Sequence, residues 1–159
     1  MSQTSRSALA IFDPSFDYGQ LSRLIGFHLR SASLLDFRTF SETMGDRSVT
    51  PLRYSVLEVV GANPGLQQVQ IAAMLGLSKS AATLVIDFWQ ERDCLIRRRS
   101  GSDRRAYGVL LTEQGQRKLA ELRPKVAHHD AMLTASLSQE EIAQLFSPLR
   151  KIIDDIVRN

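Results

Sequence analysis

The stretch CLIRRRSGSDRRAYGVLLTEQG, residues 94–115, places the chain's densest positive charge between two short apolar runs. Five arginines lie at positions 97 to 105, and with Asp103 they carry a charge of +4, more than the net +3 of the whole 159-residue chain. Because the remainder is nearly neutral, the positive field is local, which favours docking of one anionic partner over general adhesion. The apolar runs predict strands over 94–99 and 106–111, separated by the polar loop at 100–103.

Upstream of this predicted hairpin, residues 71–86 (IAAMLGLSKSAATLVI) have the layout of a helix-turn-helix. Ala72 is small enough to let two helices approach, Gly76 allows a sharp turn with positive φ, and Ser78 can cap the second helix. A helix that reads the major groove, followed by a hairpin that reaches phosphates or the adjacent minor groove, explains both features together. The sequence therefore predicts a winged helix-turn-helix lobe over residues 50–111, with its wing at 94–111.

Helical apolar spacing precedes this lobe. We expect a long helix over residues 17–43 that ends near Gly45. A second helix should begin at Pro51 with Thr50 as its N-cap, since proline is well tolerated at the first helical position.

Two more helices are expected after the wing. Thr112 should cap a helix over residues 113–136, in which Pro124 should introduce a kink. Ser138 and Glu141 form a capping box for a last helix whose apolar residues recur at i, i+3 and i+4. The predicted fold class is mainly α with a small β-hairpin.

The last helix is so apolar on one face that it needs a partner surface. A palindromic DNA site needs two DNA-binding domains. A homodimer would supply the second domain and would also cover the apolar face of the last helix. The alternative is that this helix packs only within its own monomer. We expect one domain over residues 1–159, in which 17–45 and 113–159 supply the dimerisation helices. The expected interface residues are Leu21, Ile142, Leu145, Phe146, Leu149, Ile153 and Ile156.

Residues 83–115 resemble the signature region of the MarR family of bacterial winged helix-turn-helix regulators, and the helix order outside this region is similar too. The matching residues are Thr83, Asp87, Arg97-Arg98, Asp103-Arg104-Arg105 and LTEQG at 111–115. The resemblance implies a dimeric DNA-binding regulator in which Asp103 orients an arginine that enters the minor groove. Three positions depart from the family pattern: Leu84 stands where arginine is frequent, Trp89 where leucine is usual and Asp93 where glycine is usual.

The expected DNA contacts come from the recognition helix and the wing. Ser78 fits a purely capping role equally well, whereas Thr83 is polar amid apolar residues. Because side chains alternate along a strand, at most two of the arginines at 97–99 can face DNA, and the remaining one packs against the helix or meets solvent. The predicted DNA-binding residues are Ser78, Lys79, Ser80, Thr83, Arg98, Asp103, Arg104 and Arg105.

The resemblance also implies a small-molecule effector. Family members commonly bind aromatic anions between the dimerisation helices and the DNA-binding lobe, and residues 61–82 are similar to the branch that controls aromatic-acid catabolism. Some members of that branch respond to CoA thioesters, whose phosphates suit arginine. The candidate effector residues are Phe27, His28, Arg30, Arg38 and Tyr54, for several of which a packing role is an open alternative.

Other classes of function find little support. The single Cys94 excludes an internal disulfide, the adjacent pair His128 and His129 points about 100° apart on a helix, and nothing resembles a nucleophilic triad or a phosphate-binding glycine loop. We expect no enzyme, metal or cofactor, no membrane span or signal peptide, and a cytoplasmic protein. The predicted function is a sequence-specific dimeric repressor released by a small aromatic carboxylate or its CoA thioester. The alternatives are a winged-helix protein–protein module and an oxidation sensor that uses Cys94.

Overall fold

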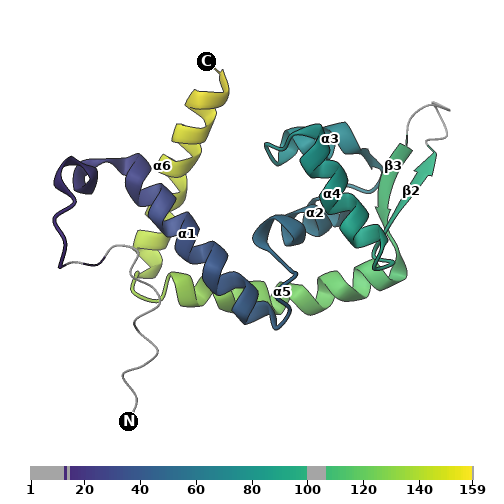
Figure 1. The fold of residues 1–159 in the computed structure, drawn as a ribbon, viewed down its shortest axis with the longest axis horizontal. Helices are drawn as coiled ribbons and strands as arrows, with labels where there is room; N and C mark the ends of the chain where they lie inside the picture. The colour runs from purple at the N-terminus through teal and green to yellow at the C-terminus, as the bar shows by residue number, and fades with distance from the viewer. Residues whose placement is uncertain (1–12, 14, 100–106, 159) are drawn as a thin grey trace, which may run out of the picture. The chain divides into compact units, whose positions relative to one another are not determined.

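The structure is a computed structural model that describes residues 13, 15–99 and 107–158, with side chains described up to residue 155. The chain divides into two compact units, Met1–Val126 and Ala127–Asn159. The elements in chain order (Figure 1) are the 3-10 helix η1 (Gly19–Arg23), α1 (Ile25–Met44), α2 (Pro51–Ala62), β1 (Leu66–Gln67), α3 (Gln68–Met74), α4 (Lys79–Gln90), β2 (Leu95–Arg99), β3 (Tyr107–Leu111), α5 (Glu113–Leu133) and α6 (Gln139–Arg158). The expected fold class, mainly α with a small β element, is confirmed.

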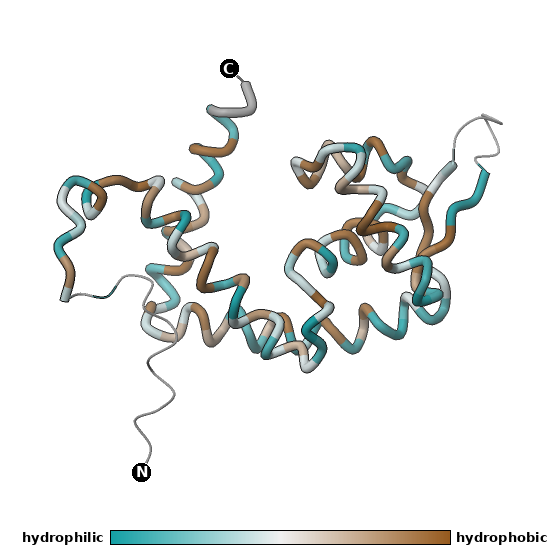
Figure 2. Tube along the Cα trace, in the orientation of Figure 1, coloured by the Kyte–Doolittle hydropathy of each residue, from teal (hydrophilic) through white to brown (hydrophobic). Residues whose placement is uncertain are grey.

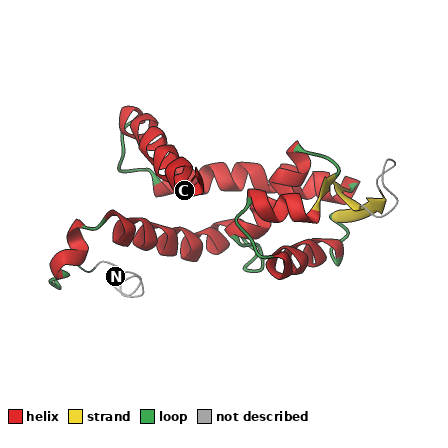
Figure 3. Ribbon diagram, turned by 90° about the horizontal axis from the view of Figure 1, so that it is seen from above, coloured by secondary structure: helices red, strands yellow, loops and turns green. Residues whose placement is uncertain are grey.

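The sheet contains three antiparallel strands in the order β1-β3-β2, one strand more than the hairpin expected from the sequence. The register pairs Leu66 with Val109, Leu95 with Leu111, and Arg99 with Tyr107. Strand β1 can pair because Gly108 has no side chain: a Cβ there would lie 2.6 Å from the carbonyl oxygen of Gly65. Figure 3 shows β2 and β3 side by side at the edge of the helices of this lobe.

The turn between α3 and α4 forms as the sequence predicts. Gly76 adopts φ +62°, and the Leu77 amide donates to the carbonyl oxygen of Ala72 at 2.8 Å. The Ser78 hydroxyl accepts from the Ala81 amide at 3.2 Å and caps α4. These local bonds fix the direction in which α4 leaves the turn.

The core of the first unit lies where α2, α3, α4, the sheet and the start of α5 meet. Trp89, at the departure from the usual leucine, is buried there, and its indole nitrogen donates to the Arg53 carbonyl at 2.8 Å. A buried indole needs such an acceptor, so the larger side chain is accommodated without an unpaired donor. Among the described residues, the largest fully buried side chains are those of Met44, Val49, Val56, Leu57, Val60, Ile71, Ile86, Trp89, Val109 and Leu122.

The N-terminal helix expected over residues 17–43 is interrupted, and this prediction was wrong in its first third. Gly19, with φ +54°, opens the short η1, and Leu24 is extended at φ −97° and ψ 118° before α1 begins. The apolar spacing continues across Leu24, so periodicity alone could not reveal the break. The helix ends as expected at Gly45, with φ +72°.

Helix α5 begins as expected, because the Thr112 hydroxyl accepts from the Gly115 amide at 3.0 Å. It ends at Leu133, three residues before the expected end at 136, and its residues 113–126 belong to the first unit. Pro124 lies within it.

In the second unit, the capping box before α6 is confirmed. The Ser138 amide donates to Glu141 at 2.8 Å and the Glu141 amide donates to the Ser138 hydroxyl at 3.2 Å. Pro148, which the sequence reasoning overlooked, lies within α6. Apolar positions recur along α1 and along α6 (Figure 2).

No single helix among the described residues is long and apolar enough to cross a membrane. Within the same described part of the chain, α3 and α4 taken together have the required length and composition, but they are bent by 111° relative to each other.

Candidate nucleic-acid interface

The first turn of α4 is the exposed start of the predicted recognition helix. Lys79 and Ser80 are exposed, and the hydroxyls of Ser78 and Ser80 lie 3.0 Å apart. The unpaired amides and positive dipole of a helix N-terminus attract anions, and the Lys79 ammonium adds a full charge. This turn can therefore hold a phosphate or present hydroxyls to a base edge.

Thr83, one turn further, is half-buried and already engaged within the lobe. Its hydroxyl donates to the Lys79 carbonyl at 2.9 Å and accepts from the Gln68 side-chain amide at 2.5 Å. The side chain thus links α4 to the start of α3. Its contact with DNA stays a prediction, but its hydroxyl has one further lone pair at most to offer.

Arg97 ties the wing to α4. Its guanidinium lies 2.7 Å from the Asp87 carboxylate and 3.2 Å from the Gln68 side-chain oxygen, and it also donates to Gln90. One arginine of the basic strand is therefore turned towards the helix, as the alternation of side chains predicts. Asp87 and Arg97 of the signature region thus form an ion pair that joins β2 to α4.

The remaining arginines of β2 are exposed. Arg98 follows Arg97 in the strand and so projects from the opposite face, towards the side of the sheet that carries Ile96. Arg99 donates to the Tyr107 hydroxyl at 3.2 Å, which joins the ends of β2 and β3. Contact of Arg98 with DNA stays a prediction. Asp103, Arg104 and Arg105 lie outside the described residues.

The candidate effector residues fall into two places along α1. Phe27 packs against Tyr18 with ring centroids 5.7 Å apart, and the His28 ring nitrogen lies 2.9 Å from the Ser22 carbonyl oxygen. Tyr54 instead packs against Phe40, thirteen residues further along the helix or about 20 Å away. One protomer therefore does not bring these candidates to a single small ligand. Arg30 and Arg38 are both exposed on α1.

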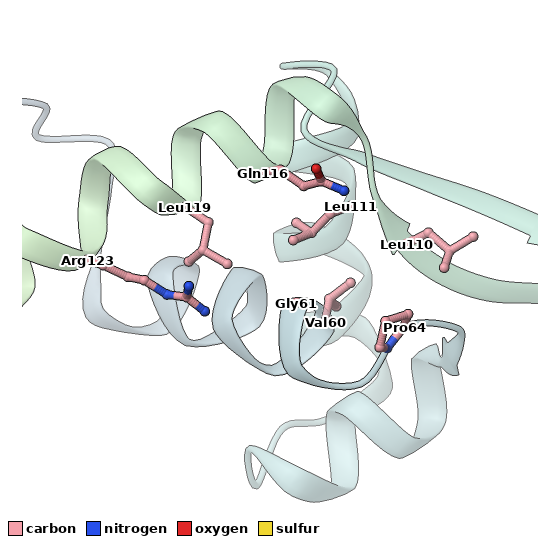
Figure 4. Close-up of a pocket in the computed structure, with 8 residues that line it drawn as sticks. All are labelled: Val60, Gly61, Pro64, Leu110, Leu111, Gln116, Leu119 and Arg123. Atoms are coloured by element: carbon pink, nitrogen blue, oxygen red, sulfur yellow. The ribbon is translucent and has the colours of Figure 1, made fainter.

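A cavity of about 350 Å³ lies between the end of α2, strand β3 and the first half of α5. Figure 4 shows Leu111 and Leu119 directed towards α2, with Gln116 and Arg123 as the polar groups of the lining. The lining residues are Val60, Gly61, Pro64, Leu110, Leu111, Gln116, Leu119 and Arg123. Sequence reasoning missed this cavity because its walls come from the end of α2 and from the consecutive elements β3 and α5, two segments that lie far apart in the chain.

Arg123 at this cavity belongs to a polar chain across α2 and α5. It donates to both carboxylate oxygens of Glu58, at 2.8 and 3.1 Å, and the Tyr54 hydroxyl donates to the same carboxylate at 2.9 Å. Hydrogen bonds from Arg123 and then Tyr54 hold the pKa of Glu58 below its usual value, although partial burial opposes this. Burial, then the bond to Glu58, raises the pKa of Tyr54 to about 12. Tyr54 is therefore a neutral donor at physiological pH.

Cys94 lies at the junction of α4 and β2 and is 3% exposed. Its thiol donates to the Arg92 carbonyl at 3.4 Å, and burial raises its pKa, although nearby Lys118 and Arg92 oppose this. These are the properties of an unreactive protonated thiol, not of an accessible thiolate. Within the described part of the chain, no group of three or more His, Cys, Asp or Glu residues is placed to hold a metal ion.

Both candidate dimerisation segments expose apolar side chains. In the first unit these include Leu21 of η1, and in the second Leu145, Phe146 and Ile153 of α6. Ile142 and Leu149 of α6 are partly buried, and the side chain of Ile156 lies outside the description.

Comparison with known proteins identifies the family. Residues 48–106 match the MarR family. The transcriptional regulatory protein for the hcr operon of Thauera aromatica is 32% identical over 136 residues, which cover 85% of this chain and 82% of that protein.

Solved structures agree along most of the chain. The repressor CouR, bound to a 23-mer DNA duplex, is 34% identical with a TM-score of 0.81 and covers 87% of this chain and 98% of its own. CouR bound to p-coumaroyl-CoA gives 32% identity and a TM-score of 0.78, over 87% and 97% of the two chains. PcaV of Streptomyces coelicolor in complex with its natural ligand is 26% identical with a TM-score of 0.78, and the match covers 87% of this chain and 98% of PcaV. The chain therefore belongs to the MarR family and is a transcriptional regulator of the MarR type.

Proposed function

We propose that this protein is a homodimeric repressor that binds operator DNA through α4 and the wing, and that a small aromatic carboxylate or its CoA thioester releases it. The observation that carries the proposal is the Arg97–Asp87 ion pair at 2.7 Å, which holds the arginine-bearing strand β2 against α4. A helix for the major groove and a basic strand for the backbone are thereby presented as one unit. The DNA-bound form of CouR, at 34% identity, supports this use of the lobe.

A homodimer supplies the second DNA-binding lobe. Two copies related by two-fold symmetry would read two half-sites of a palindrome, which one lobe cannot do. The exposed apolar residues of α6, such as Phe146 and Ile153, are the surface that such a partner would cover.

The cavity between α2, β3 and α5 is the proposed effector site. Its volume of about 350 Å³ suits a single aromatic ring, one face of which would pack against Leu111 and Leu119. The ligand carboxylate would lie near Arg123 and compete with Glu58 for the guanidinium, since both are anions that prefer its paired donors. Because β3 belongs to the wing and α5 continues towards the second unit, occupancy of the cavity would act on the spacing of the DNA-binding lobes.

A mobility-shift assay on the control region beside its own gene tests the DNA-binding part of this proposal. We expect a specific complex that survives competitor DNA and weakens steeply as salt rises. Absence of a complex at every salt concentration would contradict the repressor function and would favour a protein–protein module.

Thermal shifts with a panel of aromatic acids and their CoA thioesters test the effector part. We expect stabilisation by at least one acid, with a loss of DNA affinity at the same concentrations. Arg123→Gln should lose this response while still binding DNA. A ligand that acts equally on wild type and on Arg123→Gln would place the effector site elsewhere.

A further inference from the structure

The outward face of α4 presents an unusual side chain for a helix that meets DNA. Polar residues of the helix are engaged within the lobe: Thr83 bonds to Gln68 and to the backbone, and Asp87 pairs with Arg97. Beyond the first turn, the side chain that remains well exposed is Leu84, at 71% of its full surface. It projects from the middle of the helix, one turn after the exposed Ser80 and on the same face.

Leu84 contributes nothing to the core of its own lobe at this exposure. Its isobutyl group can neither donate nor accept a hydrogen bond, so it gains nothing from phosphates or from the polar edges of G·C pairs. In the major groove, the C5-methyl group of thymine is the one apolar group that a base pair presents. An exposed leucine at the centre of a recognition helix is matched to that methyl group.

We propose that Leu84 is a specificity-determining residue that contacts the C5-methyl group of a thymine in each half-site. The inference rests on the proposed function, since it requires α4 to enter the major groove. A cytosine edge at the same position would place its amino group against the leucine, where it would lose water without gaining a partner. Leu84 therefore selects a T·A pair, where an arginine at this position would favour guanine. A 5-methylcytosine carries the same methyl group, so the shared chemistry is a methyl on C5 of a pyrimidine.

The test begins with the tightest duplex that wild-type protein selects from a randomised library. Each thymine of that duplex is replaced in turn by deoxyuridine, which pairs identically and lacks only the methyl group. We expect one position in each half-site at which the replacement weakens binding about fourfold, the contribution of one buried methyl group. Leu84→Ala should bind the thymine and deoxyuridine duplexes equally, and its unfolding temperature should match wild type because the side chain is exposed.

Two further arms identify the methyl group as the feature that is read. Cytosine at the sensitive position should weaken wild-type binding, and 5-methylcytosine there should restore part of the affinity for wild type but not for Leu84→Ala. Val69→Ala, which removes an exposed apolar side chain from α3 instead, should keep the full sensitivity to deoxyuridine.

The outcomes distinguish a failure of the proposed DNA-binding function from a failure of the role proposed for Leu84. If wild type selects no duplex, the proposed DNA-binding function fails and this inference fails with it. If it selects a duplex but tolerates deoxyuridine at every position, or if Leu84→Ala keeps the same loss, DNA binding stands and the role of Leu84 is overturned.

Discussion

At the residue scale, Arg97 joins strand β2 to helix α4. Its guanidinium joins Asp87 of α4 and Gln68 of α3 to strand β2. Arg97→Gln should lower the free energy of unfolding by about 1–2 kcal/mol, because it removes a partly exposed ion pair and two hydrogen bonds. It should also weaken operator binding, since α4 and β2 would no longer share one geometry. Urea denaturation and fluorescence anisotropy measure the two effects.

Arg98→Gln is the matched control, because it removes the same charge from the opposite face of the same strand. We expect the stability of this variant to stay near that of wild type. Equal losses of stability in both variants would show that the charge of β2, and not the contacts of Arg97, is responsible.

Glu58 predicts a pH dependence of stability. Its carboxylate binds Arg123 and Tyr54, which lowers its pKa in the folded state below the usual 4.5. The stabilisation is therefore fully present above the usual pKa and is lost as the pH falls through the lowered value. The free energy of unfolding of wild type should exceed that of Glu58→Gln by about 0.5–1 kcal/mol at pH 7, and this difference should shrink as the pH falls below 4.5.

Urea titrations from pH 3 to 7 measure this difference. Glu42→Gln, at an exposed position of α1, controls for the change in net charge. If the free energy of unfolding of wild type exceeded that of Glu58→Gln by the same amount at pH 3 as at pH 7, the ionised carboxylate would not be the source of the stabilisation.

At the element scale, the start of α5 is held against the junction of α4 and β2 by a glycine. A Cβ on Gly115 would overlap the carbonyl oxygen of Cys94, a backbone atom that cannot move aside alone. Gly115→Ala should therefore destabilise the lobe by about 3 kcal/mol or more.

Gly26→Ala makes a matched comparison, because Gly26 also lies in the first turn of a helix but has nothing within 4 Å of the place that an added Cβ would take. Alanine has the better helix propensity, so this variant should be neutral or more stable by about 0.5 kcal/mol. Thermal unfolding of both variants measures these changes in stability. A stable Gly115→Ala would refute the close approach of α5.

Features set by a few neighbouring residues could be predicted from the sequence. The positive φ of Gly76, the Ser78 cap and the Thr112 cap each depend on residues within four positions of one another. The short β1 could not be predicted, because two residues carry no periodicity and its pairing depends on the distant Gly108. The break at Leu24 was hidden by apolar spacing that continues across it.

In the candidate site, too, local features could be predicted from the sequence and long-range contacts could not. Alternation along the strand was enough to predict that one arginine of β2 packs against the helix or meets solvent, but not that Arg97 would reach both Asp87 and Gln68. The cavity beside Leu119 was missed, since its walls meet only in the folded lobe.

At the scale of the whole molecule, the exposed apolar face of α6 predicts the oligomeric state. Ile153 is 60% exposed, and a glutamate there would place a charge within the proposed interface. Ile153→Glu should sediment largely as a monomer at micromolar concentration and lose most of its operator affinity. Gln144→Glu, which adds the same charge on the opposite side of α6, should remain a dimer. A dimeric Ile153→Glu would exclude this face of α6 from the interface.

The central claim is that α4 and the wing bind duplex DNA as a unit. Fluorescence anisotropy with the duplex from the control region beside its own gene, titrated at several salt concentrations, tests it most directly. We predict specific binding in the presence of competitor DNA, with an affinity that falls about a thousandfold between 50 and 200 mM salt if six phosphates are contacted. Binding that is absent throughout, or that does not change with salt, would contradict the account.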